Sequence, residues 1–207
     1  MNDVKETMKA ILLAESEAVK NIPVGDEYCS AVDLIVERVH RRGGKLVTSG
    51  MGKCGQIADN IATTFASTGT PAIFLHPSEA QHGDLGVLQP NDVMLLLSNS
   101  GRTSEILSLV ALAHALYPAL PIIVITGSLD SPLAGLATVV LHTGGAPEVC
   151  PLGLTPTTST TTMTVIGDVL VVNTMKATGF TRQDYARRHH GGYLGRKANE
   201  TQNTSPQ

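Results

Sequence analysis

Aromatic residues are scarce in this sequence. Its 207 residues include no Trp and only three Phe, although hydrophobic residues make up 42% of the chain. A chain of this length is expected to form one domain of ordinary size, or one domain with appendages. The core of that domain must then be built from aliphatic side chains.

Strong charge excess and long apolar runs are missing as well. The formal net charge of −3 gives no reason to expect a nucleic acid or a membrane surface as a partner. The apolar runs fall far short of the roughly 20 residues that span a membrane, and the polar start, residues 1–6, resembles no secretion signal. Cys29, Cys54 and Cys150 are widely spaced and odd in number, which is typical of reduced thiols. We therefore expect a cytoplasmic protein.

Short apolar runs alternate with helical patterns along the chain. Strands are expected at 45–48, 72–75, 93–97, 122–125 and 138–141. Helices are expected at 3–20, from an N-cap at Asp26 to Gly43, at 53–66, 103–116 and 158–177, with short ones opening at Ser131-Pro132 and after a cap at 181–184. Continuous rather than alternating apolar strands favour a parallel sheet covered on both faces, a three-layer α/β sandwich.

Two segments are expected to lack regular structure. The polar stretch 76–86 is predicted to be a loop, and residues 198–207 are polar, without periodicity, and predicted to be a disordered tail. Residues 1–197 then form a single domain. Because ligands of parallel sheets bind beyond the carboxyl ends of the strands, the polar motifs that follow each strand are candidates for a binding site.

The segment Ser98–Glu105 lies between an expected strand and an expected helix. The free N–H groups of a first helical turn attract an anion, and the hydroxyls of Ser98, Ser100, Thr103 and Ser104 can donate further bonds to a phosphate. Glu105 stands just past this turn, where a carboxylate could serve as an acid or base. An ordinary cluster of N-cap residues is the alternative interpretation.

A second glycine-rich turn, 50–55, follows the first expected strand. It matches the G-x-G-x-x-G dinucleotide fingerprint, but no acidic residue ends the next strand, and Lys53 is not placed as in a Walker loop. These mismatches argue against a nicotinamide or nucleotide site. The turn still carries Lys53 to the ligand edge, where the ammonium group could hold a phosphate or polarise a carbonyl. The alternative is a solvated lysine at a helix start.

Glu148 lies in a loop that prolines stiffen on both sides. A carboxylate held in such an apolar loop could have a raised pKa and act as a general base, although an exposed loop Glu is the commoner outcome. The Thr-rich stretch 155–164 begins the next helix. Its hydroxyls could bind substrate oxygens or could bond back to their own helix.

Histidines occur in two polar segments. His76 and His82 stand among carboxylates, but their spacing matches no zinc pattern, so a structural loop is preferred over a metal site. His189 and His190 precede a Gly pair and form a titratable element near neutral pH.

Several blocks of the sequence match one known family. They are Gly50–Lys53, Phe65–Pro71, His82–Gly86, Ser98–Gly101, Cys150–Thr157 and Gly191–Lys197. Over residues 30–197 the chain resembles the sugar isomerase (SIS) family, whose fold is flavodoxin-like, and the last two blocks are similar to the arabinose-5-phosphate isomerases within it. The resemblance implies an aldose–ketose isomerase that interconverts D-ribulose 5-phosphate and D-arabinose 5-phosphate through an enediol, without a metal or organic cofactor. It also suggests that the product supplies Kdo biosynthesis for lipopolysaccharide or capsule.

The resemblance also implies which residues form the site. The catalytic residues would be Lys53, Glu105, Glu148 and His189. The substrate-binding residues would be Ser49, Gly50, His82, Ser98, Asn99, Ser100, Thr103, Thr157, Thr158, Ser159 and Thr160. Whether Glu148, Glu105 or His189 is the base that takes the carbon-bound proton stays open. His190 stands where the family usually has Pro, and Arg102 and Thr103 replace an acidic residue and a Ser.

Partners are implied in the same way. The ligand would be a small sugar phosphate, and the protein would be a homo-oligomer, a tetramer built from dimers, in which His189 completes a neighbour's site. The chain ends ten residues after Lys197, so it resembles a short form without CBS regulatory domains. Two alternatives stay open: a sugar-phosphate-binding SIS regulator without catalysis, and a SIS isomerase for another phosphosugar.

Overall fold

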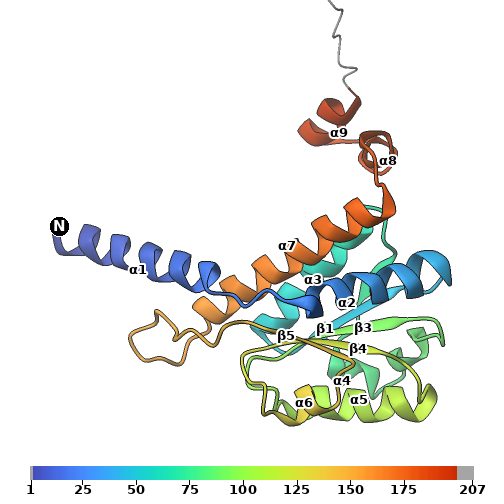
Figure 1. The fold of residues 1–207 in the computed structure, drawn as a ribbon, viewed down its shortest axis with the longest axis horizontal. Coiled ribbons are helices and arrows are strands. Elements are labelled where there is room, and N and C mark those ends of the chain that lie inside the picture. The colour runs from blue at the N-terminus through green and yellow to red at the C-terminus, as the bar shows by residue number, and fades with distance from the viewer. Residues whose placement is uncertain (1, 200–207) are drawn as a thin grey trace, which may run out of the picture.

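Five parallel strands form the centre of the protein. The computed structural model describes residues 2–199. The strand order is β2 (Ala72–Phe74), β1 (Leu46–Gly50), β3 (Val93–Leu97), β4 (Ile122–Thr126) and β5 (Val139–His142) (Figure 1). Every residue of β1, β3 and β4 is buried, as expected for strands covered on both faces. The predicted flavodoxin-like sandwich is confirmed.

Helices cover both faces of this sheet. One layer contains α2 (Asp26–Ile35), which continues into a π-helical turn (Val36–Arg41), together with α3 (Lys53–Ser67) and α7 (Thr158–Thr178). The other contains α4 (Pro77–Ala80), α5 (Ser104–Leu116) and α6 (Pro132–Gly135) (Figure 1). Both cores are mainly aliphatic, with Phe65 the largest fully buried side chain. The long helix α7 packs against α1, α2 and α3 and is therefore central in its layer.

Local signals explain most helix ends. Ser131 accepts the backbone N–H of Ala134, and a capping box links Thr181 to Asp184 at the start of α8 (Arg182–Ala186). One predicted cap is wrong. Asp26 is the first residue of α2, and Gly25 stands at the N-cap position.

Two segments are more regular than the sequence indicated. The expected loop 76–86 contains α4 and a 3₁₀ turn, Asp84–Val87, because Pro77 suits a first helical position and Ala80 is buried in the core that α5 covers. The tail predicted from residue 198 is wrong for Ala198 and Asn199, which end α9 (Gly192–Asn199). The Arg182 side chain donates to the carbonyls of Lys197 and Ala198, which ties α8 to α9. Residues 200–207 lie outside the described residues.

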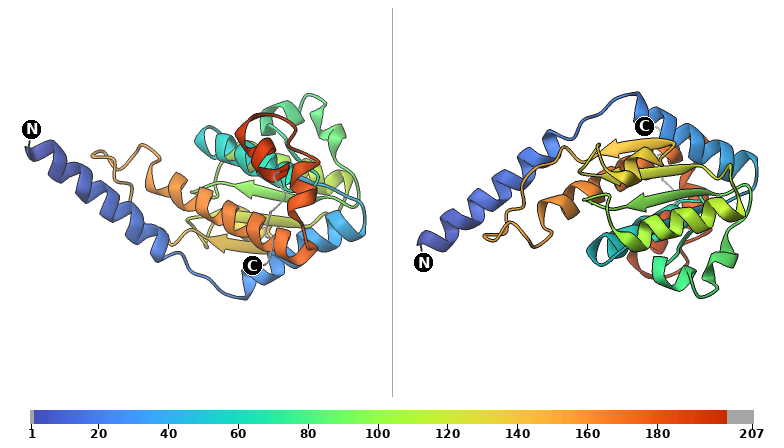
Figure 2. Two further views of the ribbon diagram at one scale, coloured as in Figure 1. Left: turned by 90° about the horizontal axis from the view of Figure 1, so that it is seen from above. Right: turned by 90° about the horizontal axis from the view of Figure 1, so that it is seen from below.

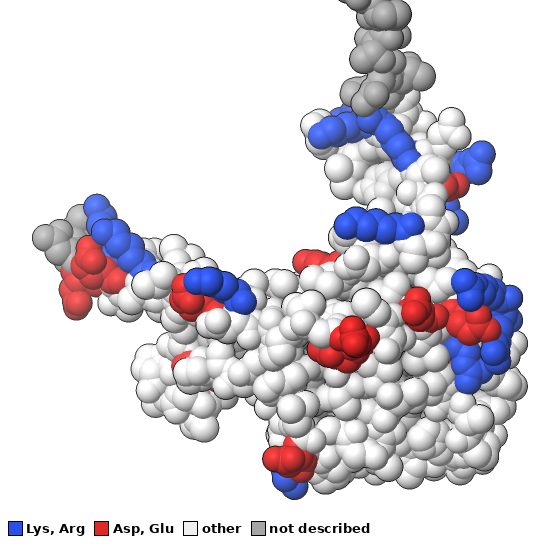
Figure 3. Space-filling view, viewed as in Figure 1, with Lys and Arg blue, Asp and Glu red and all other residues white. Residues whose placement is uncertain are grey.

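Two helical arms extend from the sandwich. Helix α1 (Asn2–Lys20) projects past the carboxyl edge of the sheet, and α8 and α9 lie beyond the other end of α7 (Figures 1 and 2). The exposed residues of α1 include Val4, Met8 and Leu12. Basic side chains gather over α8 and α9 (Figure 3). Within residues 2–199, every helix is too short or too polar to cross a membrane.

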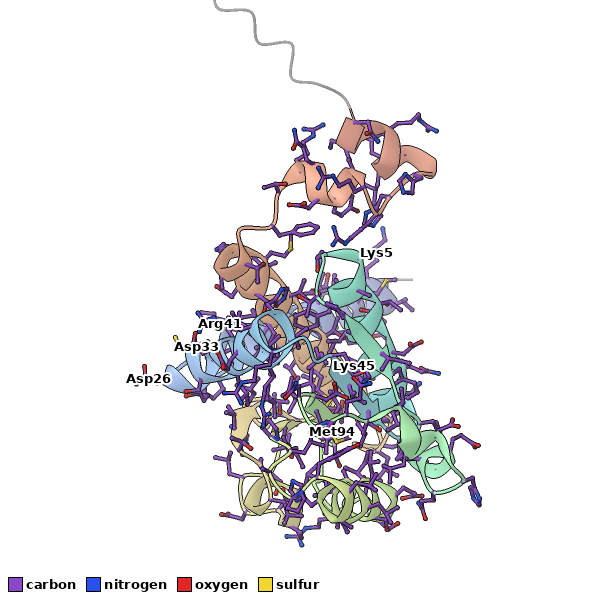
Figure 4. The ribbon with its side chains drawn as sticks, turned by 90° about the vertical axis from the view of Figure 1, so that its right-hand side faces the viewer. Lys5, Asp26, Asp33, Arg41, Lys45 and Met94 are labelled. Atoms are coloured by element: carbon purple, nitrogen blue, oxygen red, sulfur yellow. The ribbon has the colours of Figure 1, made fainter. Side chains whose placement is uncertain are left out.

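The amino edge of the sheet is closed by an ion pair. Lys45 Nζ lies 2.7 Å from a carboxylate oxygen of the fully buried Asp92, which also accepts the backbone N–H groups of Lys45 and Gln89. Lys45 and Met94 lie at the level of the sheet, between the helical layers (Figure 4). The buried carboxylate is satisfied by these donors, so this edge has a structural role and the opposite edge is the place for a site.

Candidate active site

Within residues 2–199, five helices begin at the carboxyl edge of the sheet. α3, α4, α5 and α6 follow β1, β2, β3 and β4, and α7 begins after the loop that leaves β5. Each N-terminus presents free N–H groups and the positive end of a helix dipole. This edge is therefore suited to anionic groups, whether they belong to the protein or to a ligand.

Hydrogen bonds within the hydroxyl-rich turn before α5 fix its backbone conformation. Ser98 Oγ lies 3.0 Å from Thr103 Oγ1 and accepts the Gly101 N–H at 3.2 Å, while Ser100 Oγ accepts the Arg102 N–H. Gly101 has φ +61°, and a Cβ there would lie 2.0 Å from Ser131 Oγ, so only glycine fits. Thr103 occupies the N-cap position of α5 without capping it.

Asn99 and Ser100 are exposed at this turn, and Glu105 stands in the first turn of α5 with partial exposure. Glu105 accepts the Ser104 hydroxyl at 2.9 Å. Its own backbone N–H and the Ser104 hydroxyl lower the pKa of Glu105. The carboxylate is therefore ionised at neutral pH, at the edge of a turn suited to an anion.

The Glu148 carboxylate caps α7. Its Oε2 accepts the Thr157 N–H at 2.6 Å, the Thr157 hydroxyl at 2.8 Å and the Ser159 N–H at 3.3 Å. Partial burial acts to raise the pKa of Glu148, but the hydrogen bonds from Ser159 and Thr157 outweigh it and the pKa is lowered. The expected raised pKa is wrong, because the loop brings the carboxylate onto a helix N-terminus rather than into an apolar pocket.

The threonine hydroxyls of α7 are engaged mostly within the protein. Thr160 Oγ1 donates to the Thr157 carbonyl at 2.6 Å, and Thr162 and Thr164 likewise bond back one turn. Thr158 and Ser159 are buried. Of the two interpretations of this stretch, bonding back to its own helix describes Thr160, Thr162 and Thr164.

Lys53 faces the start of α7 across a groove. The groove measures about 400 Å³, and its lining includes Lys53, Gln56, Pro156 and Thr160. Lys53 is exposed and belongs to no ion pair among residues 2–199. The structure thus brings a free ammonium group to the same edge as the Glu148 cap.

Cys54 links three parts of this edge. Burial raises the pKa of Cys54; the backbone N–H of Asn99 opposes that effect, and the negative charge of Glu148 adds to it. Cys54 is next to Lys53 in sequence, so the starts of α3 and α7 and the turn after β3 all meet here. No sequence pattern indicated that Cys54 would be the residue between them.

The remaining candidates near β1 and β2 differ in their exposure. Ser49 is fully buried and donates its hydroxyl to the Leu75 carbonyl at 2.6 Å. Gly50 allows β1 and α3 to approach closely, because a Cβ there would lie 2.7 Å from the backbone of Cys54. His82 is exposed just beyond α4. Within residues 2–199, no three His, Cys, Asp or Glu side chains gather as metal ligands would.

His189 is not brought together with the other candidates within one chain. It follows α8, beyond the carboxyl end of α7 (Figure 1), and the 21 residues of α7 span about 30 Å. The His189 ring stacks on Tyr185 with centroids 3.7 Å apart, and Nδ1 lies 3.0 Å from the Tyr185 carbonyl. Because Nδ1 must donate to that oxygen, Nε2 is the free acceptor of the neutral ring.

One residue near the site was missed entirely. Glu15 of α1 accepts a hydrogen bond from Thr158 Oγ1 at 3.2 Å, which brings a second carboxylate to the start of α7. The two residues are 143 positions apart. The helical pattern over residues 3–20 predicted the helix but contained no signal for where its last turns would dock.

Comparison with known proteins places these observations in a family. Residues 40–173 match the family model described as SIS domain. Arabinose 5-phosphate isomerase KdsD of Shigella flexneri is 46% identical over 196 residues, which cover 94% of this chain and 58% of that relative. KdsD of Pseudomonas aeruginosa is 44% identical over 88% of this chain and 55% of its own length. The chain thus spans less than two thirds of the length of these curated relatives.

Solved structures agree with this placement. A candidate phosphosugar isomerase involved in capsule formation from Bacteroides fragilis has 65% identity and a TM-score of 0.91, covering 92% of this chain and 99% of that one. Protein c3406 of Escherichia coli CFT073, solved in complex with arabinose 5-phosphate, has 34% identity and a TM-score of 0.84. The match covers 91% of this chain and 98% of that one.

The Glu148 cap predicts a pH-dependent stability. At pH 7, Glu148→Gln is expected to lower the free energy of unfolding by about 0.3–1 kcal/mol, because the amide oxygen can still accept the hydrogen bonds but carries no charge to offset the helix dipole. A carboxylate whose pKa is lowered by folding stabilises the protein above its unfolded pKa of about 4.3, and this contribution is lost as the pH falls through the native pKa. Urea unfolding at pH 7 and pH 3.5 should therefore show a difference between variant and wild type that narrows in acid. Glu6→Gln, at a carboxylate with 71% side-chain exposure, is the control. A difference independent of pH would contradict the cap.

Proposed function

Because this chain belongs to the SIS domain family, we propose that it is an aldose–ketose isomerase that interconverts D-ribulose 5-phosphate and D-arabinose 5-phosphate. The observation that carries the proposal is that Cys54, which follows Lys53, lies near both the Glu148 carboxylate and Asn99 of the turn before the uncapped N-terminus of α5. The names of the KdsD relatives and the arabinose 5-phosphate complex of c3406 support the choice of substrate.

The turn before α5 is proposed to hold the phosphate. A dianion placed there would accept the free N–H groups of the first helical turn and the hydroxyls of Ser98, Ser100 and Thr103. Asn99 would add a contact from the same turn. Fixing the phosphate orients the sugar, so that its carbonyl end meets the same groups in every turnover.

The chemical problem is to move a proton between C1 and C2 of the sugar. A base takes the proton from the carbon next to the carbonyl, an enediolate forms, and the proton returns to the other carbon. We assign the base to Glu148 in preference to Glu105 and His189, because its three hydrogen bonds end on Oε2 and leave Oε1 to face the substrate. A positioned base contributes about 10²–10⁴-fold.

The other groups would complete the reaction. The Lys53 ammonium would stabilise the negative charge on the enediolate oxygen. Glu105 would orient a sugar hydroxyl from the first turn of α5. The free Nε2 of His189 would move a proton between the two oxygens or open the arabinose ring. The further substrate contacts we propose are Gly50, His82, Thr157 and Thr160, whereas the buried Ser49, Thr158 and Ser159 would act only from behind this lining.

We further propose a homo-oligomer, a tetramer built from dimers, in which His189 acts in a neighbouring copy's site. The separation of His189 from Glu148 along α7 supports this arrangement. The exposed apolar residues of α1, among them Val4, Met8 and Leu12, also favour burial against another copy. In this view residues 1–197 act as a single domain with two arms that serve assembly.

The setting of the reaction is proposed on the same basis. The free thiols of Cys29, Cys54 and Cys150 are typical of a cytoplasmic enzyme, and the arabinose 5-phosphate formed would supply Kdo biosynthesis.

A coupled assay tests the reaction. Wild-type protein should interconvert ribulose 5-phosphate and arabinose 5-phosphate and leave glucose 6-phosphate unchanged. In D₂O the product should gain deuterium at the reacting carbon, and Glu148→Gln should lose about 10²-fold or more in both turnover and exchange. Binding of either pentose phosphate without turnover would favour a regulator, and turnover of glucose 6-phosphate alone would favour another isomerase. Retained exchange in Glu148→Gln would move the base to Glu105 or His189.

Mixing two inactive variants tests the shared site. Lys53→Ala and His189→Ala should each be inactive alone. After co-expression, about a quarter of the sites should combine an intact Lys53 from one copy with an intact His189 from its neighbour, and activity should return to about that fraction. Mixtures that stay inactive although mass spectrometry detects mixed oligomers would contradict a site shared between copies.

A further inference from the structure

Helix α1 contacts the body of the protein only near its carboxyl end. From Asp3 onward its residues are exposed until the last two turns, where Glu15, Ala18 and Val19 are partly or fully buried. In the described part of α1, Glu15 is the one carboxylate that is partly buried, since Asp3, Glu6 and Glu17 are all exposed. The helix therefore places one acidic side chain against the start of α7.

A short chain of hydrogen bonds leads from this carboxylate to Glu148. Glu15 Oε1 accepts the Thr158 hydroxyl at 3.2 Å, and the same hydroxyl oxygen accepts the Val149 N–H at 3.2 Å. Val149 directly follows Glu148, and its N–H also reaches Thr157 Oγ1 at 3.2 Å. By accepting the hydrogen of the Thr158 hydroxyl, Glu15 fixes the orientation of that hydroxyl. The hydroxyl oxygen in turn holds the backbone N–H of Val149, which is next to Glu148.

The second oxygen of Glu15 argues against a role in stability alone. Glu15 Oε2 is buried and has no hydrogen-bond partner among residues 2–199. An unpartnered buried carboxylate oxygen is unfavourable for folding, because it has lost water and gained nothing in return. An apolar side chain at this position would avoid that loss, so the carboxylate is better explained by what Oε1 does.

We propose that Glu15 is a positioning residue of the active site, which acts through Thr158 and the Val149 backbone to hold Glu148 on the N-terminus of α7. The inference rests on the proposed function for its catalytic meaning, since Glu148 is the proposed base. The hydrogen-bond acceptor is what matters at this position, so an amide oxygen serves in its place. Loss of the acceptor frees the Thr158 hydroxyl and loosens the loop at Val149.

Because Glu15 acts on the position of Glu148 and not on phosphate binding, its loss should lower kcat and leave KM nearly unchanged. In Glu15→Ala the loop that carries Glu148 is less fixed, so kcat falls by about tenfold to a hundredfold, as expected for a misplaced reacting group. KM changes little, because the phosphate is held on the far side of the site by the turn before α5. The hydrogen bonds to Glu148 also weaken, and its pKa rises toward the ordinary value for Glu. Glu15→Gln keeps the acceptor and keeps both properties near those of wild type.

The experiment compares Glu15→Ala, Glu15→Gln and Thr158→Val with Glu17→Ala, which changes an exposed Glu on the same helix. Two measurements are made on the intact protein: kcat and KM for arabinose 5-phosphate across pH 4–9, and the carboxyl titration of Glu148 by ¹³C NMR. Thermal melts establish that each variant is folded. Glu15→Ala and Thr158→Val should lower kcat and raise the Glu148 pKa, whereas Glu15→Gln and Glu17→Ala should leave both unchanged.

The NMR titration does not require turnover, so the inference stands or falls separately from the isomerase assignment. If the wild type catalyses nothing, the proposed function fails while the Glu148 pKa still reports whether Glu15 holds it. An unchanged Glu148 pKa in folded Glu15→Ala overturns the inference, whatever the activity. A loss of kcat in Glu15→Ala that comes with a similarly large change in KM also overturns it, as does an equal loss of kcat in Glu17→Ala.

Discussion

The candidate active site depends on the hydrogen bonds between the Glu148 carboxylate and the first turn of α7. Together with the bonds from the Val149 N–H to the Thr157 and Thr158 hydroxyls, they fix the loop after β5. They also offset the positive end of a 21-residue helix with the protein's own negative charge. The result is a carboxylate that is ionised at neutral pH and pinned through one oxygen, which suits a base.

Two helix termini at the carboxyl edge of the sheet therefore have different tasks. The N-terminus of α7 is occupied by the protein's own carboxylate, whereas that of α5 has no side-chain cap and is surrounded by the hydroxyls of Ser98, Ser100 and Thr103. A phosphate would be drawn to the open terminus and repelled from the filled one. In the proposed reaction, this asymmetry would give a sugar phosphate one orientation, with its carbonyl end toward Lys53 and Glu148.

Much of the fold follows from the sequence, because strand and helix periodicities repeat locally. The five apolar runs, the Ser131-Pro132 helix start and the Thr181 capping box are all short-range signals, and the structure has each of them. The site is harder to predict, because its geometry depends on contacts between distant segments. Glu148 was predicted as a candidate base, but its lowered pKa comes from Thr157 and Ser159, and the sequence does not show that the loop folds back onto them. The pairing of Glu15 with Thr158 is likewise invisible without the fold.

The most direct test is a crystal structure of the protein with D-arabinose 5-phosphate bound. Our account predicts that the phosphate lies on the Ser98–Thr103 turn and that C1 and C2 lie within hydrogen-bonding reach of Lys53 Nζ and Glu148 Oε1, with a neighbouring copy's His189 closing the site. A phosphate bound at the start of α7 in place of the Glu148 carboxylate, or a sugar that leaves Lys53 and Glu148 on opposite sides of the assembly, would contradict it.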